Sequence, residues 1–198
     1  MFPRKFFAAV SLICLLVFIF VSLGAGISSA AGITALNVAI LPPVNTDKYA
    51  DAKVIGIIQA KIARHFRYPY YEVLAPDKVC NAVSLLGSAS EGKQKYYDEE
   101  FMRSVSQKLS ADIVVVAELA RVRSYMYTRR LGGDTYEKTE VVLHCYTYSV
   151  KDGKYNKVTV RSYNFDTVGV FSGLNTIVPD LTDKMLEKIP YRTIPEES

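Results

Sequence analysis

The sequence predicts an α/β fold of the α+β kind, in which a mixed sheet combines an N-terminal βαβαα(β) half, an antiparallel meander and a C-terminal helix. Residues 111–119 (ADIVVVAEL) form an apolar run without polar alternation, which is typical of a central strand covered on both faces. Helix-like patterns and short apolar runs precede it, and long alternating segments broken by Gly-Gly-Asp and Asp-Gly follow it. The chain of 198 residues is expected to hold one globular domain over residues 36–189 and a frayed tail over 190–198.

The N-terminus has the pattern of an export signal. Arg4 and Lys5 precede an uncharged stretch over residues 6–27, and small residues follow it. As a helix this stretch would measure about 33 Å, enough to cross a bilayer. Residues 1–31 are therefore either a signal peptide or an N-terminal membrane anchor. The small-x-small spacing favours cleavage after Ala30 or Ala31.

Both outcomes place the folded part outside the cytoplasm, in the periplasm or another extracytoplasmic compartment. An uncleaved segment over residues 6–27 would also contact the membrane and anchor the protein to the inner membrane. Removing residues 1–31 takes only Arg4 and Lys5 from the 24 basic residues, which leaves 22 against 20 acidic ones. This balance and the export signal argue against nucleic acid as a partner.

Three cysteines need separate interpretations. Cys14 lies in the apolar stretch and lacks the small residues that precede a lipidated cysteine. Cys80 and Cys145 remain after export and can form a disulfide in an oxidising compartment. The simpler interpretation is that each is a small buried hydrophobic residue.

The remaining elements follow in chain order. A strand over residues 36–41 ends at Pro42 and Pro43, and an amphipathic helix over about residues 50–66 follows it. A short strand over 71–74, a helix from 76 to about 86, a polar loop over 88–95 and a helix over 98–109 lead to the central strand. The last helical pattern is interrupted by Pro179, which predicts either a kinked helix or a turn followed by a helix.

The meander carries the candidate binding surface. Asp152-Gly153 predicts a tight hairpin with Val150 opposite Tyr155, and a turn centred on Gly132-Gly133 sets the register of the other strand pair. Together the two registers place His144 between Arg121 and Arg161. The candidate partner-binding residues on this face are Arg121, Arg123, Tyr125, His144, Tyr146, Tyr148, Arg161 and Tyr163.

The opposite face of the meander is smaller and more apolar, with Val122, Leu143 and Cys145, so we assign it to the helices and the core. The face with arginine and tyrosine then points to solvent or to a partner. The simpler interpretation is a solvated sheet face, because such faces are common. The alternative is a protein interface, where Tyr and Arg are enriched.

No catalytic constellation, cofactor motif or metal-ligand spacing stands out. His65 and His144 are the only histidines, and the sequence has no Gly-rich phosphate loop or nucleophile elbow. Carboxylates such as Asp98 and Glu140 would meet only through the fold. The sequence therefore predicts a noncatalytic protein-interaction or scaffolding module, with a small-molecule or peptidoglycan-fragment binder as the alternative and a hydrolase last.

Four segments and the order of elements resemble exported envelope domains. The segments are residues 38–42 (VAILP), 71–76 (YEVLAP), 109–115 (LSADIVV) and the hairpin over 150–154. The similar families are the amino-terminal domain of the Tol translocation protein TolB, the curli secretion lipoprotein CsgG and the penicillin-binding-protein activator LpoB. The resemblance covers about residues 36–189 and implies partner binding or scaffolding in the cell envelope, with an envelope protein or a peptidoglycan-associated partner. The chain lacks the lipobox cysteine of the lipoproteins and the propeller of the Tol protein.

Overall fold

The computed structural model describes residues 34–46, 48, 52–89, 95–128, 135–167 and 174–191. The predicted export signal over residues 1–31 and most of the predicted tail lie outside these ranges. Residues Ala35–Ser198 form one compact unit. Its elements are β1 (Leu36–Ile40), β2 (Val44–Asn45), α2 (Ala52–His65), β3 (Tyr71–Val73), α3 (Pro76–Ala89), α4 (Glu99–Leu109), β4 (Ile113–Thr128), β5 (Thr135–Ser149), β6 (Lys154–Thr167) and α5 (Leu174–Leu186).

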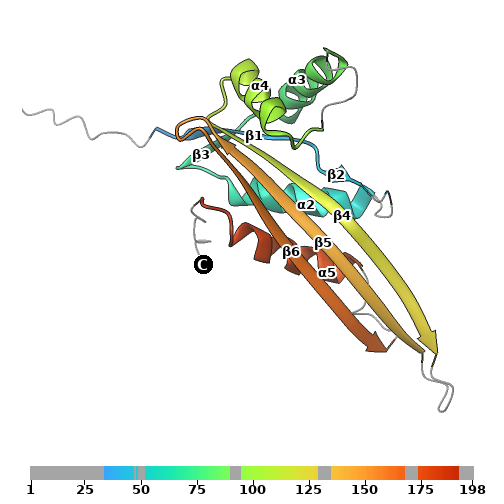
Figure 1. Cartoon of the computed structure of the whole chain (residues 1–198). Helices are drawn as coiled ribbons and strands as arrows, with labels where there is room; N and C mark the ends of the chain where they lie inside the picture. The colour runs from blue at the N-terminus through green and yellow to red at the C-terminus, as the bar shows by residue number, and fades with distance from the viewer. Residues whose placement is uncertain are drawn as a thin grey trace, which may run out of the picture. The chain divides into compact units, whose positions relative to one another are not determined.

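The elements build a mixed six-stranded sheet with helices, which confirms the predicted fold class (Figure 1). The strand order is β3-β1-β4-β5-β6, and β2 pairs with β4. β1 runs parallel to β3 and β4, whereas β4, β5 and β6 form the antiparallel meander. β4 is therefore the central strand, as predicted, and every side chain over residues 113–119 is buried.

Helices α2 and α5 cover one face of the sheet. Ile58 and Ile62 on α2 and Leu181 and Met185 on α5 pack with the apolar residues of β4 and β5, including Leu143. Buried aliphatic side chains at helical spacing explain why these two segments fold as amphipathic helices. α5 is a single helix that contains Pro179.

Helices α3 and α4 cover only part of the opposite face. Val79 from α3 and Phe101 and Met102 from α4 pack against Val114 and Val116 of β4. α4 begins after Asp98 with two acidic residues in its first turn, which suits the positive end of a helix dipole. Figure 1 shows the three long meander strands continuing past α3 and α4, so the outer half of this face lacks a helical cover.

The hairpin between β5 and β6 differs from the prediction. Four residues, from Val150 to Gly153, separate the strands, so Ser149 is opposite Lys154 and Tyr148 is opposite Tyr155. Gly153 has a φ of 59° and its N–H donates to the carbonyl of Val150. A glycine in the left-handed region at the end of a longer loop replaces the expected two-residue turn. The predicted pairing of Val150 with Tyr155 is wrong by two residues, which keeps each side chain on its predicted face.

The pairing of β4 with β5 contains an irregularity that the sequence prediction missed. Leu119 is opposite Leu143 and Arg121 is opposite Val142, so Ala120 is an extra residue at a β-bulge. The predicted row that put Arg121 directly beside His144 is therefore wrong. His144 is instead opposite Glu118 on β4 and Thr159 on β6.

The structure does not pair Cys80 with Cys145, since both thiols are free. Cys145 is buried among the residues under α2 and α5, as the simpler interpretation predicted. Cys80 is exposed on α3, so its predicted burial is wrong. Separately, the helices of the described residues are too short or too polar for any of them to cross a bilayer.

Candidate functional site

All eight candidate partner-binding residues lie on one face of the meander. The pairs Arg123 with Glu140 and Glu140 with Tyr163 fix which side chains share this face across the three strands. Positions two apart along a strand point the same way, which adds the others. We call this surface the Arg–Tyr face. Its uncovered part carries Arg121, Arg123, Tyr125, Glu140, His144, Arg161, Tyr163 and Phe165.

Tyr146 and Tyr148 do not belong to the uncovered part, and their predicted exposure is wrong. Their exposed fractions are 4% and 6% because they lie in the core beneath α4. Tyr97 stacks on Tyr146 with ring centroids 4.7 Å apart, and the guanidinium of Arg103 lies 5.8 Å from the ring centroid of Tyr148. The prediction failed here because sequence periodicity identifies a face but does not show where a helix will cover it.

The uncovered part of the Arg–Tyr face is rich in exposed aromatic side chains. Tyr125 is 55% exposed, and Tyr163 and Phe165 are each 63% exposed. Tyr136 stacks on Phe165 with centroids 5.3 Å apart and an interplanar angle of 3°. Tyr127, which is opposite Tyr136, extends the same strip and is 59% exposed. We call this strip, with Tyr125, Tyr127, Tyr136, Tyr163 and Phe165, the aromatic platform at the outer end of the strands.

The reverse side of the same outer strands is mostly polar, although Met126 there is 74% exposed. Ser124, Thr139 and Asn164 form one row there, and the hydroxyl of Ser124 donates to Glu137 at 2.6 Å. Soluble sheets usually place polar residues toward water and apolar residues toward cover. The reverse side is nevertheless the more buried of the two at this row, since Thr139 is only 2% exposed, whereas the platform on the other side belongs to neither apolar cluster of the described residues.

His144 is half-buried at the inner edge of the uncovered part. Its Nδ1 lies 2.9 Å from the hydroxyl oxygen of Thr159. Burial lowers the pKa of His144, and the positive charges of Lys157 and Arg161 lower it further, whereas Glu118 acts in the opposite direction. The imidazole is consequently neutral over most of the physiological pH range.

A buried carboxylate that sequence reasoning missed lies next to this edge. The Tyr146 hydroxyl donates to Glu118 at 2.7 Å, and the Thr46 hydroxyl donates to its other oxygen at 2.6 Å. Burial raises the pKa of Tyr146, and the hydrogen bond with Glu118 raises it further. The available signal was a single charged residue inside the apolar run of the central strand, since buried carboxylates need hydrogen-bond donors.

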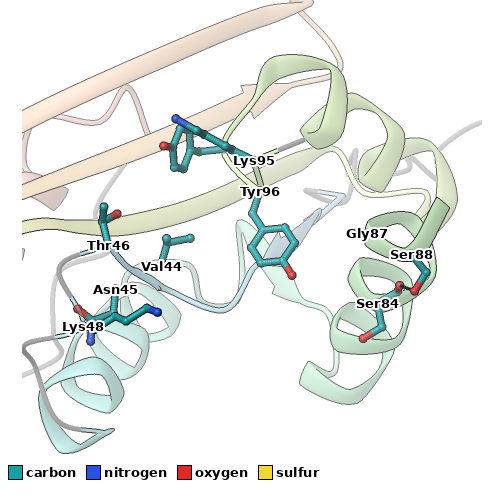
Figure 2. Close-up of a pocket in the computed structure, with 10 residues that line it drawn as sticks. Val44, Asn45, Thr46, Lys48, Ser84, Gly87, Ser88, Lys95 and Tyr96 are labelled. Carbon is teal, nitrogen blue, oxygen red and sulfur yellow. Dashed lines mark hydrogen bonds between the residues drawn. The ribbon is translucent and has the colours of Figure 1, made fainter. Parts of the chain in front are cut away.

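A cavity of about 710 Å³ lies between the β2 segment, α3 and the residues before α4. Figure 2 shows the ring of Tyr96 between Val44 and Thr46 on one side and Ser84 and Ser88 on the other. The lining is mixed, with two lysines, Lys48 and Lys95, as well as hydroxyl and aromatic groups. Hydroxyl, ammonium and aromatic groups of this kind can contact a small polar ligand.

Metal and catalytic candidates have little support in the described ranges. No group of three or more His, Cys, Asp or Glu residues there is arranged to hold a metal ion. His65 is buried at the end of α2, next to Phe66, and burial lowers its pKa. Lys61, from the basic last turns of α2, forms an ion pair with Asp183 on α5. The contacts of His65 and Lys61 therefore indicate a role in packing α2 against its neighbours.

No family model matches the chain, and no curated protein matches its sequence. Several solved structures are similar. A lipoprotein of Neisseria meningitidis is 16% identical over 77% of this chain and 99% of that chain, with a TM-score of 0.45. The PelC dodecamer from Paraburkholderia phytofirmans is 17% identical over 80% of this chain and 90% of that one, with a TM-score of 0.39. The LpoB C-terminal domain from Salmonella enterica is 12% identical over 68% and 89%, with a TM-score of 0.39.

Proposed function

We propose that this protein is an exported, noncatalytic interaction module of the cell envelope that binds a protein partner through the uncovered part of the Arg–Tyr face. The export signal pattern over residues 1–31 supports the location. Arginine and exposed aromatic side chains on one face of the meander support a role in binding.

The main observation in support of this proposal is the aromatic platform. Tyr125, Tyr127, Tyr163 and Phe165 are each more than half exposed on one side of the outer strands. Contiguous exposed apolar surface on a soluble domain is typical of an interaction site. Arginines beside tyrosines add to this, because both residue types contribute strongly to binding energy when a partner excludes water from them.

Site-specific photocrosslinking in the native cell tests the proposal. A photoreactive phenylalanine analogue replaces Tyr163 in the full chain, and in a matched control it replaces Tyr68, which is 82% exposed outside this face. We expect a discrete crosslinked partner from position 163 and not from position 68. Tyr125→Ser/Phe165→Ser should abolish that crosslink, because both rings belong to the platform. Equal crosslinking from the two positions would refute a role for the face.

A second candidate function is binding of a small polar molecule, such as a peptidoglycan fragment, in the cavity beside β2. The volume of about 710 Å³ lies within the range of ligand pockets, and hydroxyl and ammonium groups converge on it. Tyr96→Ala should then weaken binding of soluble muropeptides, as measured by ligand-detected NMR, while Tyr68→Ala should not. Binding that is insensitive to Tyr96→Ala would rule out this cavity.

A further inference from the structure

The uncovered part of the Arg–Tyr face contains a hollow of about 130 Å³, lined by Ala120, Arg121, Val142, His144 and Arg161. Val142 is directly opposite both Arg121 on β4 and Arg161 on β6, so a short side chain separates two long cationic ones. The bulge places a second small residue, Ala120, at the same place. The hollow therefore has small apolar side chains at its centre and cationic groups on both sides.

Positive charge predominates around this hollow. Arg121 lies 3.5 Å from Glu140, a long and partly exposed ion pair of the kind that contributes little energy. Arg161 forms no ion pair with any of the described residues. Burial is the main cause of the lowered pKa of His144; Lys157 and Arg161 lower it further, and Glu118 opposes them, so two cations and one carboxylate act on that ring. An anionic group placed here would meet Arg161, which has no ion pair with the described residues, and Arg121, whose ion pair with Glu140 is long.

We infer that the hollow receives a carboxylate from an acidic side chain in an extended segment of the protein partner, held between Arg121 and Arg161. This inference rests on the proposed function and names the chemistry of its partner. Neighbouring strands are about 4.8 Å apart, so the backbones of Arg121 and Arg161 are separated by about 10 Å, which leaves room for one group between them. Guanidinium groups match the two oxygens of a carboxylate and form strong charge-assisted hydrogen bonds.

The size of the hollow restricts what can enter it. At about 30 Å³ per water molecule, 130 Å³ corresponds to roughly four waters. A carboxylate group, with one carbon and two oxygens, fits this space. Tyr163, two residues after Arg161 on the same face, offers an aromatic surface to the residue next to the bound carboxylate.

A protein carboxylate suits this face better than an anionic lipid surface does. Glu140 lies on the same face, opposite both Arg123 and Tyr163, so a uniformly anionic bilayer would also meet a carboxylate. A segment with separate acidic and neutral positions avoids that repulsion. Like charges brought together at an interface oppose binding.

Peptide binding to the full chain in a nonionic detergent tests the inference. The probe is a labelled synthetic peptide of ten residues with Glu at alternate positions, and its control has Gln at those positions. By fluorescence anisotropy, we expect the Glu peptide to bind at least about ten-fold more tightly than the Gln peptide. Arg121→Gln and Arg161→Gln should each weaken binding by about ten-fold, and Arg161→Lys by less, because it keeps the charge but loses the planar fork. Arg64→Gln, which changes an exposed arginine on α2, should leave the affinity unchanged.

Equal affinity for the two peptides, or an affinity that Arg161→Gln does not change, would overturn the inference. Binding of the full chain to phosphatidylglycerol vesicles that depends on Arg161, without binding of the Glu peptide, would overturn it in favour of a lipid surface. The photocrosslink from position 163 keeps the two proposals distinguishable. If the crosslink persists while the Glu peptide fails to bind, only the inference falls, and if both fail, the proposed function falls as well.

Discussion

Glu118 is the only carboxylate among the buried side chains of the described residues. It lies opposite His144 and accepts hydrogen bonds from Tyr146 and Thr46. Through these bonds it connects the central strand, its antiparallel neighbour and the residue after β2. A buried charge is tolerated only when donors satisfy it, so this group is expected to depend strongly on its partners.

Removing the carboxylate should destabilise the protein. Glu118→Ala leaves the buried hydroxyl of Tyr146 without its acceptor, and we expect the free energy of unfolding to fall by about 2–4 kcal/mol. Tyr146→Phe should cost about 1–3 kcal/mol, because the carboxylate then loses one donor. Urea unfolding followed by circular dichroism measures both values. Glu72→Ala, at an exposed position, is the control, and a similar loss there would contradict the argument.

His65 should make stability depend on pH. Burial lowers its pKa in the folded state below the ordinary 6.5, although a hydrogen bond with the backbone of Tyr191 opposes the shift. The unfolded chain therefore takes up a proton at a higher pH than the folded chain does. The free energy of unfolding should be greatest above about pH 7 and fall as the pH drops below 6.5, by at most about 1.4 kcal/mol per pH unit, until the folded pKa is reached.

Urea titrations at about pH 7.5 and about pH 5.5 measure this loss. His65→Gln should reduce the difference between the two pH values. His144→Gln is the matched comparison, because the pKa of His144 is also lowered but its ring is less buried. An unchanged pH dependence in His65→Gln would show that another group is responsible.

At the scale of elements, two glycines should respond in opposite directions to the same substitution. Gly153 ends the β5–β6 loop with a φ of 59°, where an L side chain is strained, so Gly153→Ala should lower the free energy of unfolding by about 1 kcal/mol. Gly56 lies inside α2, and an added Cβ would meet nothing within 4 Å, so Gly56→Ala should raise it by about 0.5–1 kcal/mol. Thermal unfolding of both variants measures the pair. The same sign at both positions would contradict this account.

The elements also show how far the sequence predicts the site. Alternation correctly assigned Arg121, Arg123 and Tyr163 to one face, because the four-residue hairpin loop shifts the register by two and keeps the faces. The bulge at Ala120 was not predictable, since an extra unpaired residue leaves no mark on the apolar pattern of β4. The neighbours of His144 were wrong because both registers differ from the predicted ones. The β5–β6 register is shifted by two, which puts Thr159 rather than Arg161 beside His144, and the β4–β5 register is shifted by two in its outer part and by one more residue at the bulge.

At the scale of the whole molecule, the cover over Tyr146 and Tyr148 depends on how α4 docks, which is a tertiary property. Amphipathic spacing predicted that the segment before β4 is a helix. It did not predict the face against which this helix packs, because both faces of the sheet carry apolar residues. The apolar residues form two clusters, one on each face of the sheet, which agrees with the prediction of a central strand covered on both faces. The uncovered remainder of the Arg–Tyr face is what α3 and α4 leave open.

The two thiols of the described ranges should report on opening of the whole fold. Cys80 is exposed, whereas burial raises the pKa of Cys145 to about 12, and only the thiolate reacts. In a Cys14→Ser chain, a maleimide should label Cys80 quickly and Cys145 only when urea unfolds the protein. Mass spectrometry of pulse-labelled samples measures the two sites. Rapid labelling of Cys145 without urea would show that the core under α2 and α5 opens locally.

Ala120 has no partner on β5, so the pairing of β4 with β5 does not depend on it. Leu119 and Arg121 have consecutive partners on β5, so a chain without Ala120 would keep regular pairing and leave every β4 side chain in its present surroundings. A deletion after Arg123 would instead remove a paired residue. It would shift the alternation by one position and turn Tyr125 and Tyr127 to the reverse side of the sheet. The bulge next to the cationic hollow is therefore a place in β4 where the loss of one residue keeps both the pairing and the faces.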